Sequence, residues 1–184
     1  LEHNVYSMLP SLVETAFLQL GLLRSGMYDA TYTAQLLSVL MAILASANLA
    51  FIVRRLLPGG WAALGGWVTA AIYLATPWVL ITGSMAYNEM AVIAFGAAAF
   101  SLTLTTPLAG ATVRLAMLAG FLAGLATLAK LTGGFMIALP VGLLWLGKAW
   151  PVSSAAIKRA GLLAGCVALA GLVTLSPYLI RNTI

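Results

Sequence analysis

The chain has 184 residues, of which 62% are hydrophobic and 7% are charged, and its mean hydropathy is +1.06. This composition excludes a soluble globular domain, because a domain of this length must cover its surface with residues that tolerate water. The net charge of +5 does not indicate nucleic-acid binding, since the basic residues are dispersed in short connections between apolar segments.

Residues 1–30 contain no segment that is long enough to span a membrane. The chain begins with Leu1 rather than Met, in a polar stretch, so we expect it to be part of a longer protein. Residues 10–23 are apolar but fall short of the roughly 20 residues that a span needs, and they include Glu14. This pattern favours a juxtamembrane or re-entrant helix. We therefore predict that 1–30 form the end of an extracytoplasmic loop, this helix and a loop over 24–29.

The succession of apolar segments in residues 31–184 predicts an all-α, polytopic transmembrane helical bundle with about six spans. The apolar segments cover 31–53, 61–81, 89–104 and 115–129, a fifth segment that ends at 146, and 160–179. Pro77, near the end of the second segment, should break or kink its helix. The third segment is short for a span, which a thin region of bilayer would accommodate.

Small and aromatic residues indicate how these helices pack and where they end. The glycine pairs Gly120/Gly124 and Gly161/Gly165 have the four-residue spacing that lets helices approach closely. Five tryptophans lie near the ends of the predicted spans, which is typical of anchors at the membrane interface. They are Trp61, Trp67, Trp78, Trp145 and Trp150.

Charged residues separate between the two ends of the predicted bundle. Six of the nine basic residues lie in alternate connections that hold no acidic residue. They are Arg54, Arg55, Arg114, Lys148, Lys158 and Arg159. Because short cytoplasmic loops of membrane proteins are rich in lysine and arginine, we expect this end to face the cytoplasm. All four acidic residues then belong to the opposite, extracytoplasmic side, where we expect any chemistry.

Glu89 is the sharpest candidate for a functional residue. It lies beside Tyr87 and Asn88 at the extracytoplasmic boundary of the third span. A carboxylate there could orient a sugar, bind a divalent cation or position a nucleophile. The structural alternative is an acidic residue in the first turn of a helix, where it complements the helix dipole, with Asn88 as the N-cap.

Two basic residues at the same end are further candidates. Lys130 interrupts an apolar run, and an ammonium group at that depth needs water or an anionic partner such as a lipid-linked phosphate. Its alternative role is snorkelling toward lipid headgroups. Arg181 ends the last segment, where it would pair with a phosphate or with Glu89, or serve as an ordinary helix-end anchor.

The sequence identifies no cofactor. His3 is the only histidine, so a zinc site built from several histidines is excluded. Catalytic triads, phosphate-binding loops, dinucleotide fingerprints and cysteine pairs are also lacking. A divalent cation remains open as a cofactor, with no metal ligands assigned.

Four stretches, taken in order, resemble motifs of the GT-C superfamily of membrane glycosyltransferases. The likeness is greatest to the bacterial branch related to protein O-mannosyltransferases and aminoarabinose transferases, of the glycosyltransferase family 39 type. Residues 4–14 resemble the end of the family's first extracytoplasmic loop, and 86–91 resemble its Tyr-x-Asp motif with Glu89 in place of Asp. Residues 124–133 resemble its Gly-Leu-Ala-x-x-x-Lys-Tyr-Thr block, and 176–182 resemble its Ser-Pro-Trp-Tyr-Leu-Arg-Asn motif.

This resemblance implies an enzyme that moves a hexose or pentose from a polyprenyl-phosphate donor to an extracytoplasmic lipid, glycan or protein. It implies that Lys130 and Arg181 contact the donor phosphate and that Glu89 and Tyr87 line the active-site cavity. The family's catalytic acid lies early in the first extracytoplasmic loop, so we expect it upstream of Leu1. The implied location is the bacterial inner membrane, with the lipid bilayer as a partner and the active side facing the periplasm or exterior.

Two other functions fit the same residues. A transporter or lipid flippase would use broken helices at Pro77 and near Lys130 together with charge inside the membrane. A non-catalytic scaffold subunit would need Glu89 and Lys130 for assembly alone.

Overall fold

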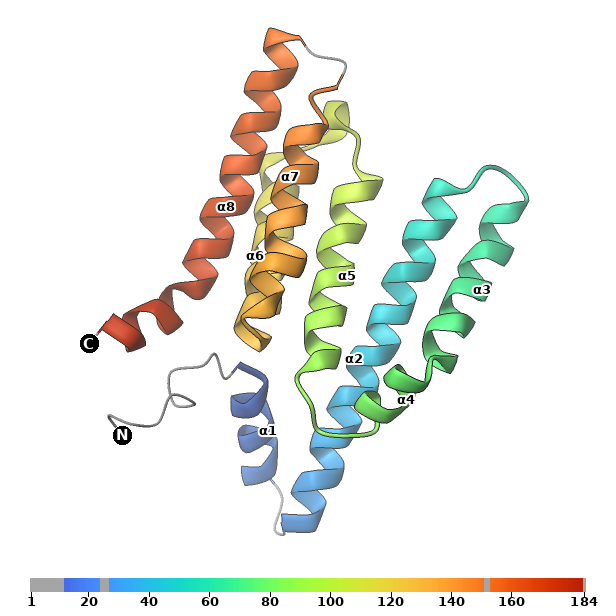
Figure 1. The fold of residues 1–184 in the computed structure, drawn as a ribbon, viewed down its shortest axis with the longest axis vertical. Helices are drawn as coiled ribbons and strands as arrows, with labels where there is room; N and C mark the ends of the chain where they lie inside the picture. The colour runs from blue at the N-terminus through green and yellow to red at the C-terminus, as the bar shows by residue number, and fades with distance from the viewer. Residues whose placement is uncertain (1–11, 24–26, 151–152, 184) are drawn as a thin grey trace.

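The computed structural model describes residues 12–23, 27–150 and 153–183, and these form helices and no strand (Figure 1). The predicted all-α class is therefore confirmed for this part of the chain. The elements are α1 (Leu12–Leu22), α2 (Met27–Leu56), α3 (Trp61–Ala75), α4 (Pro77–Gly83), α5 (Glu89–Thr105), the 3-10 turn η2 (Leu108–Gly110), α6 (Val113–Ala129), the π-helical turn η3 (Gly134–Ala138), α7 (Leu139–Gly147) and α8 (Ser154–Thr183).

The helices pack side by side, with α2 parallel to α5 and α6 parallel to α8, whereas α2 and α3 and also α5 and α6 run in opposite directions (Figure 1). Contacts are most extensive between α6 and α8, α2 and α5, α2 and α3, and α5 and α6. The order across the array is therefore α3, α2, α5, α6, α8, and α7 packs against α8 and α5 (Figure 1). The short α1 lies beside one end of α2, below α5 and α6 in the view of Figure 1.

Within the described residues, two helices are long and apolar enough to cross a membrane, at Thr31–Leu56 and Ser154–Asn182. The helices Trp61–Ala75 and Pro77–Gly83 meet at a bend of 64°. If together they form one bent span, the described residues contain three candidate spans. The predicted count of six spans is not supported, because the other apolar helices have at most 17 residues, or roughly 25 Å at about 1.5 Å per residue. That is shorter than the hydrocarbon core of about 30 Å.

The predicted break at Pro77 is confirmed. Thr76 is extended (φ −64°, ψ 124°) and ends α3, and Pro77 starts α4. A proline ring crowds the preceding residue and disfavours its helical conformation, which accounts for the position of the bend.

Helix α2 begins inside the predicted loop over 24–29. Its first residue is Met27, so Asp29 lies in a helix rather than in that loop. Residues 24–26 lie outside the described residues.

The first glycine pair lies where two helices touch, as predicted. A Cβ on Gly120 would overlap the carbonyl oxygen of Val167 in α8, and one on Gly124 would lie 2.7 Å from Cβ of Thr174. The second pair is different, because a Cβ on Gly161 or Gly165 would meet nothing within 4 Å. The spacing alone could not distinguish the packed pair from the open one.

Trp145 was wrongly predicted as an interfacial anchor. It is 0% exposed in the core formed by α5, α6, α7 and α8, and its indole N–H donates to Oγ1 of Thr103 at 3.1 Å. The remaining tryptophans are exposed, as anchors should be: Trp61, Trp67, Trp78 and Trp150.

The structure brings the six basic residues to one end of the array. The C-terminal ends of α2 and α7 and the N-terminal ends of α6 and α8 all lie there (Figure 1). Lys148 donates to the carbonyl oxygens of Thr103 and Thr106 at 2.5 and 2.6 Å. The guanidinium of Arg159 donates to the carbonyl oxygen of Ala111 at 2.9 Å. This end is called the basic end below, and the end with Glu89 and Lys130 is called the acidic end.

Candidate functional site

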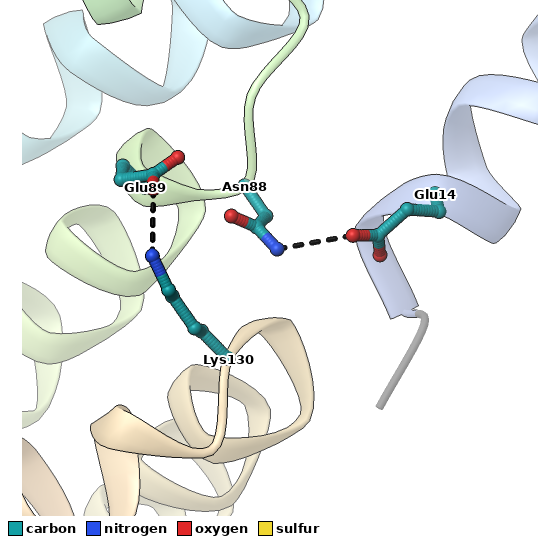
Figure 2. Close-up of polar contacts among 4 residues, drawn as sticks. All are labelled: Glu14, Asn88, Glu89 and Lys130. Carbon is teal, nitrogen blue, oxygen red and sulfur yellow. Dashed lines mark hydrogen bonds and ion pairs between the residues drawn. The ribbon is translucent and has the colours of Figure 1, made fainter. Parts of the chain in front are cut away.

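The acidic end brings together three segments that are far apart in the sequence. The connection after α4 leads into Glu89, the first residue of α5, and Lys130 directly follows the last residue of α6. Helix α1 contributes Glu14 (Figure 2). The site therefore exists because α5 and α6 run in opposite directions, so that the start of one lies beside the end of the other.

Glu89 and Lys130 form an ion pair, with Lys130 Nζ 2.7 Å from Glu89 Oε1 (Figure 2). The side chains are 25% and 44% exposed, respectively, so the pair remains accessible from outside the array. Each residue also suits its helix end, because an acidic side chain complements the positive N-terminal end of a helix dipole and a basic one the negative C-terminal end. The structural and the functional interpretations of these two residues are therefore compatible.

A sharp turn after α6 directs Lys130 toward Glu89. Lys130 is extended (φ −160°, ψ 134°), and its carbonyl oxygen accepts from the N–H of Gly133 at 2.8 Å. A Cβ on Gly133 would overlap the carbonyl oxygen of Ala126 in the last turn of α6. The chain can fold back this closely because residue 133 has no side chain.

One oxygen of the Glu89 carboxylate has no hydrogen-bond partner. Oε1 accepts from Lys130, whereas Oε2 is buried and unpaired among the described residues. Buried carboxylate oxygens usually accept hydrogen bonds, and leaving one unpaired costs free energy. The site can therefore accept a hydrogen bond from a further donor at this oxygen.

Asn88 precedes α5 as expected of an N-cap, but its side chain does not cap the helix. Its amide instead donates to Oε1 of Glu14 at 3.0 Å (Figure 2). Asn88 is therefore the N-cap residue of α5 by position but makes no side-chain capping bond, and its amide ties α1 to the start of α5. Sequence reasoning missed this contact because the two residues are 74 positions apart and no local pattern links them.

An apolar cavity of about 260 Å³ lies next to this site, between α1, α2, α5 and α6. Tyr87, expected to line an active-site cavity, is part of its wall and is half exposed. The wall also includes Val13 and Phe17 of α1 and Ala91 and Phe95 of α5. The polar cluster and an apolar recess thus lie side by side, as a site for an amphipathic molecule requires.

Arg181 lies in the last turn of α8, with its guanidinium 5.6 Å from the ring centre of Tyr178. In the described part of the chain Glu89 pairs with Lys130 and not with Arg181, so the alternative of an Arg181–Glu89 pair is not found. Among the described residues no three His, Cys, Asp or Glu side chains gather as metal ligands, and His3 lies outside them.

The ion pair predicts an energetic coupling between its two residues. We expect a double-mutant cycle with Glu89→Gln and Lys130→Met to give a coupling of about 1 kcal/mol, because the pair is partly exposed and exposed pairs contribute little. The free energy of unfolding in detergent is the quantity to measure. Additive single changes would show that the two side chains do not interact.

Comparisons of the chain with protein-family models, curated proteins and solved structures find no match.

Proposed function

We propose that the chain is the membrane-embedded part of a glycosyltransferase that moves a sugar from a polyprenyl-phosphate donor to an extracytoplasmic acceptor. The observation that carries this proposal is the accessible Lys130–Glu89 pair with one unpaired carboxylate oxygen. The cation suits a phosphate, and the free oxygen suits a hydroxyl group. The order of the four motifs that resemble GT-C enzymes supports the same function.

The charge distribution supports an orientation in the bacterial inner membrane. The basic end would face the cytoplasm, as the positive-inside rule requires, and the acidic end would face the periplasm or exterior. The 17-residue helices α5 and α6 lie at the lower limit of spanning length, and they run alongside α2 and α8 (Figure 1). We propose that they and η3–α7 cross a locally thinned bilayer, which would restore about six spans.

In this proposal Lys130 holds the phosphate of the donor. An ammonium group has three N–H donors, and one of them reaches Glu89, so two remain for phosphate oxygens. Its 44% exposure leaves room for such a ligand. The positive charge would also stabilise the phosphate that leaves during transfer. Arg181 would contribute a second positive charge near the end of α8.

Glu89 and Tyr87 would line the sugar-binding cavity, with Oε2 of Glu89 accepting from a hydroxyl group. The acceptor oxygen or nitrogen attacks the anomeric carbon, the bond from that carbon to the phosphate oxygen breaks, and polyprenyl phosphate leaves with the electron pair. The proton of the acceptor passes to a carboxylate base. We assign this base to none of the described residues.

Transfer of a radiolabelled sugar in membranes that contain the whole protein tests this proposal. We expect Lys130→Ala and Glu89→Gln each to lower transfer at least tenfold, because a phosphate contact and a hydrogen bond are lost. Lys158→Ala is the matched control, since it removes a lysine at the basic end and should leave transfer unchanged.

Three outcomes would contradict the proposal. Unchanged transfer in both variants would exclude the assigned roles. Movement of a lipid-linked sugar across proteoliposomes without covalent transfer would favour a flippase. Loss of assembly with normal turnover in the assembled fraction would favour a scaffold subunit.

A further inference from the structure

The basic end contains a second site, independent of the proposed transferase chemistry. A groove of about 580 Å³ runs between α5 and α7 and ends at Lys148. Its wall on α7 is formed by Leu139, Leu143 and Leu144, which are exposed. Helices α5 and α7 contact each other less extensively than α5 contacts α6 or α7 contacts α8, and the groove between them is open toward the surroundings of the array.

Lys148 carries a positive charge that no described carboxylate balances. Its ammonium donates to the carbonyl oxygens of Thr103 and Thr106 at 2.5 and 2.6 Å and lies 5.1 Å from the ring centre of Trp145. These partners are neutral dipoles and a ring face, and the one ion pair among the described residues is at the acidic end. Burial lowers the pKa of Lys148, as expected for a cation that lacks a counter-ion.

The donor count of Lys148 leaves one position open. An ammonium group has three N–H donors, and two of them are used by the carbonyl oxygens at the end of α5. The third N–H has no acceptor in the described part of the chain. An anion next to the groove would satisfy both this donor and the unbalanced charge.

We propose that the groove between α5 and α7 binds one anionic glycerophospholipid, with its phosphate on Lys148 and an acyl chain along the leucines of α7. Basic pockets between membrane helices on the cytoplasmic side characteristically hold anionic headgroups. The absence of acidic residues from the connections at the basic end favours an anionic lipid over a zwitterionic one. The exposed leucines match an acyl chain, which is as apolar as they are.

Retention of lipid by the purified chain tests the proposal. Native mass spectrometry would compare dioleoylphosphatidylglycerol with dioleoylphosphatidylcholine at equal concentration, and the wild-type chain should retain the first preferentially. Lys148→Gln removes the charge and should lower retention of phosphatidylglycerol about fivefold, the factor that ~1 kcal/mol per lysine near an anionic lipid surface gives. Leu143→Trp fills the groove, leaves the lysine in place and should have a similar effect.

Two control variants make the result specific. Lys158→Gln removes an exposed charge at the basic end that does not line the groove, and Leu162→Trp places a tryptophan at an exposed position of α8. Both variants should leave retention unchanged. Lys148 also donates to backbone carbonyl oxygens, so Lys148→Gln can impair folding. If that variant does not fold, lipid retention by Leu143→Trp tests the proposal. Equal retention of the two lipids, or equal losses in test and control variants, would overturn the proposal.

Discussion

Gly120→Val should lower the free energy of unfolding by ~3 kcal/mol, at the upper end of the usual cost of overpacking. A Cβ at this position would overlap the carbonyl oxygen of Val167, which belongs to the backbone of α8 and cannot rotate away as a side-chain tip could. The helices α6 and α8 form the most extensive contact in the structure, so moving them apart would also expose Ala116, Ala119 and Ala123, which are now buried.

The matched control is Gly165→Val. This glycine has the same spacing in sequence as Gly120, but a Cβ there meets nothing within 4 Å, and valine is no worse than glycine in a helix. Thermal unfolding of the detergent-solubilised chain should show a midpoint lowered by about 6–12 °C for Gly120→Val and an unchanged midpoint for Gly165→Val. Similar midpoints for the two variants would show that α6 and α8 do not pack as described.

Trp145→Ala should destabilise the chain by ~3–5 kcal/mol, the usual cost of truncating a buried aromatic side chain. Trp145 is fully buried between α5, α6, α7 and α8, where it contacts the largest hydrophobic cluster. Its removal would leave a cavity and would also leave Oγ1 of Thr103 without the indole N–H that donates to it. The cation–π contact with Lys148 would be lost as well.

Trp145→Phe and Trp150→Ala separate the contributions. The phenylalanine keeps much of the volume and loses the hydrogen bond, so an intermediate destabilisation is expected. Trp150 is 82% exposed, and its change to alanine should alter stability by less than about 0.5 kcal/mol. Unfolding in increasing concentrations of a denaturing detergent would rank the three variants, and equal values for Trp145→Ala and Trp150→Ala would contradict the buried position.

The candidate site was partly predictable from the sequence. Lys130 was recognised because a charged residue is costly inside an apolar run, and Glu89 because it lies beside Tyr87 and Asn88 at the boundary of a predicted span. Their pairing was not predicted, since they lie 41 positions apart and the pair depends on how α5 and α6 dock. The same limit explains the missed hydrogen bond between Glu14 and Asn88, and it is why the sequence alone left a phosphate, Glu89 and a helix-end anchor open for Arg181.

Hydropathy and single residues with strong local effects were sufficient for the all-α class, the break at Pro77 and the approximate limits of α5 and α6. These features depend on short-range physics, namely the apolar run and the steric effect of proline. Tertiary packing was needed to distinguish Gly120 from Gly165 and Trp145 from Trp150, because each pair looks alike in sequence. A residue's own chemistry does not reveal which face of its helix meets a neighbouring helix. The buried face is determined by how helices that are distant in the chain pack together.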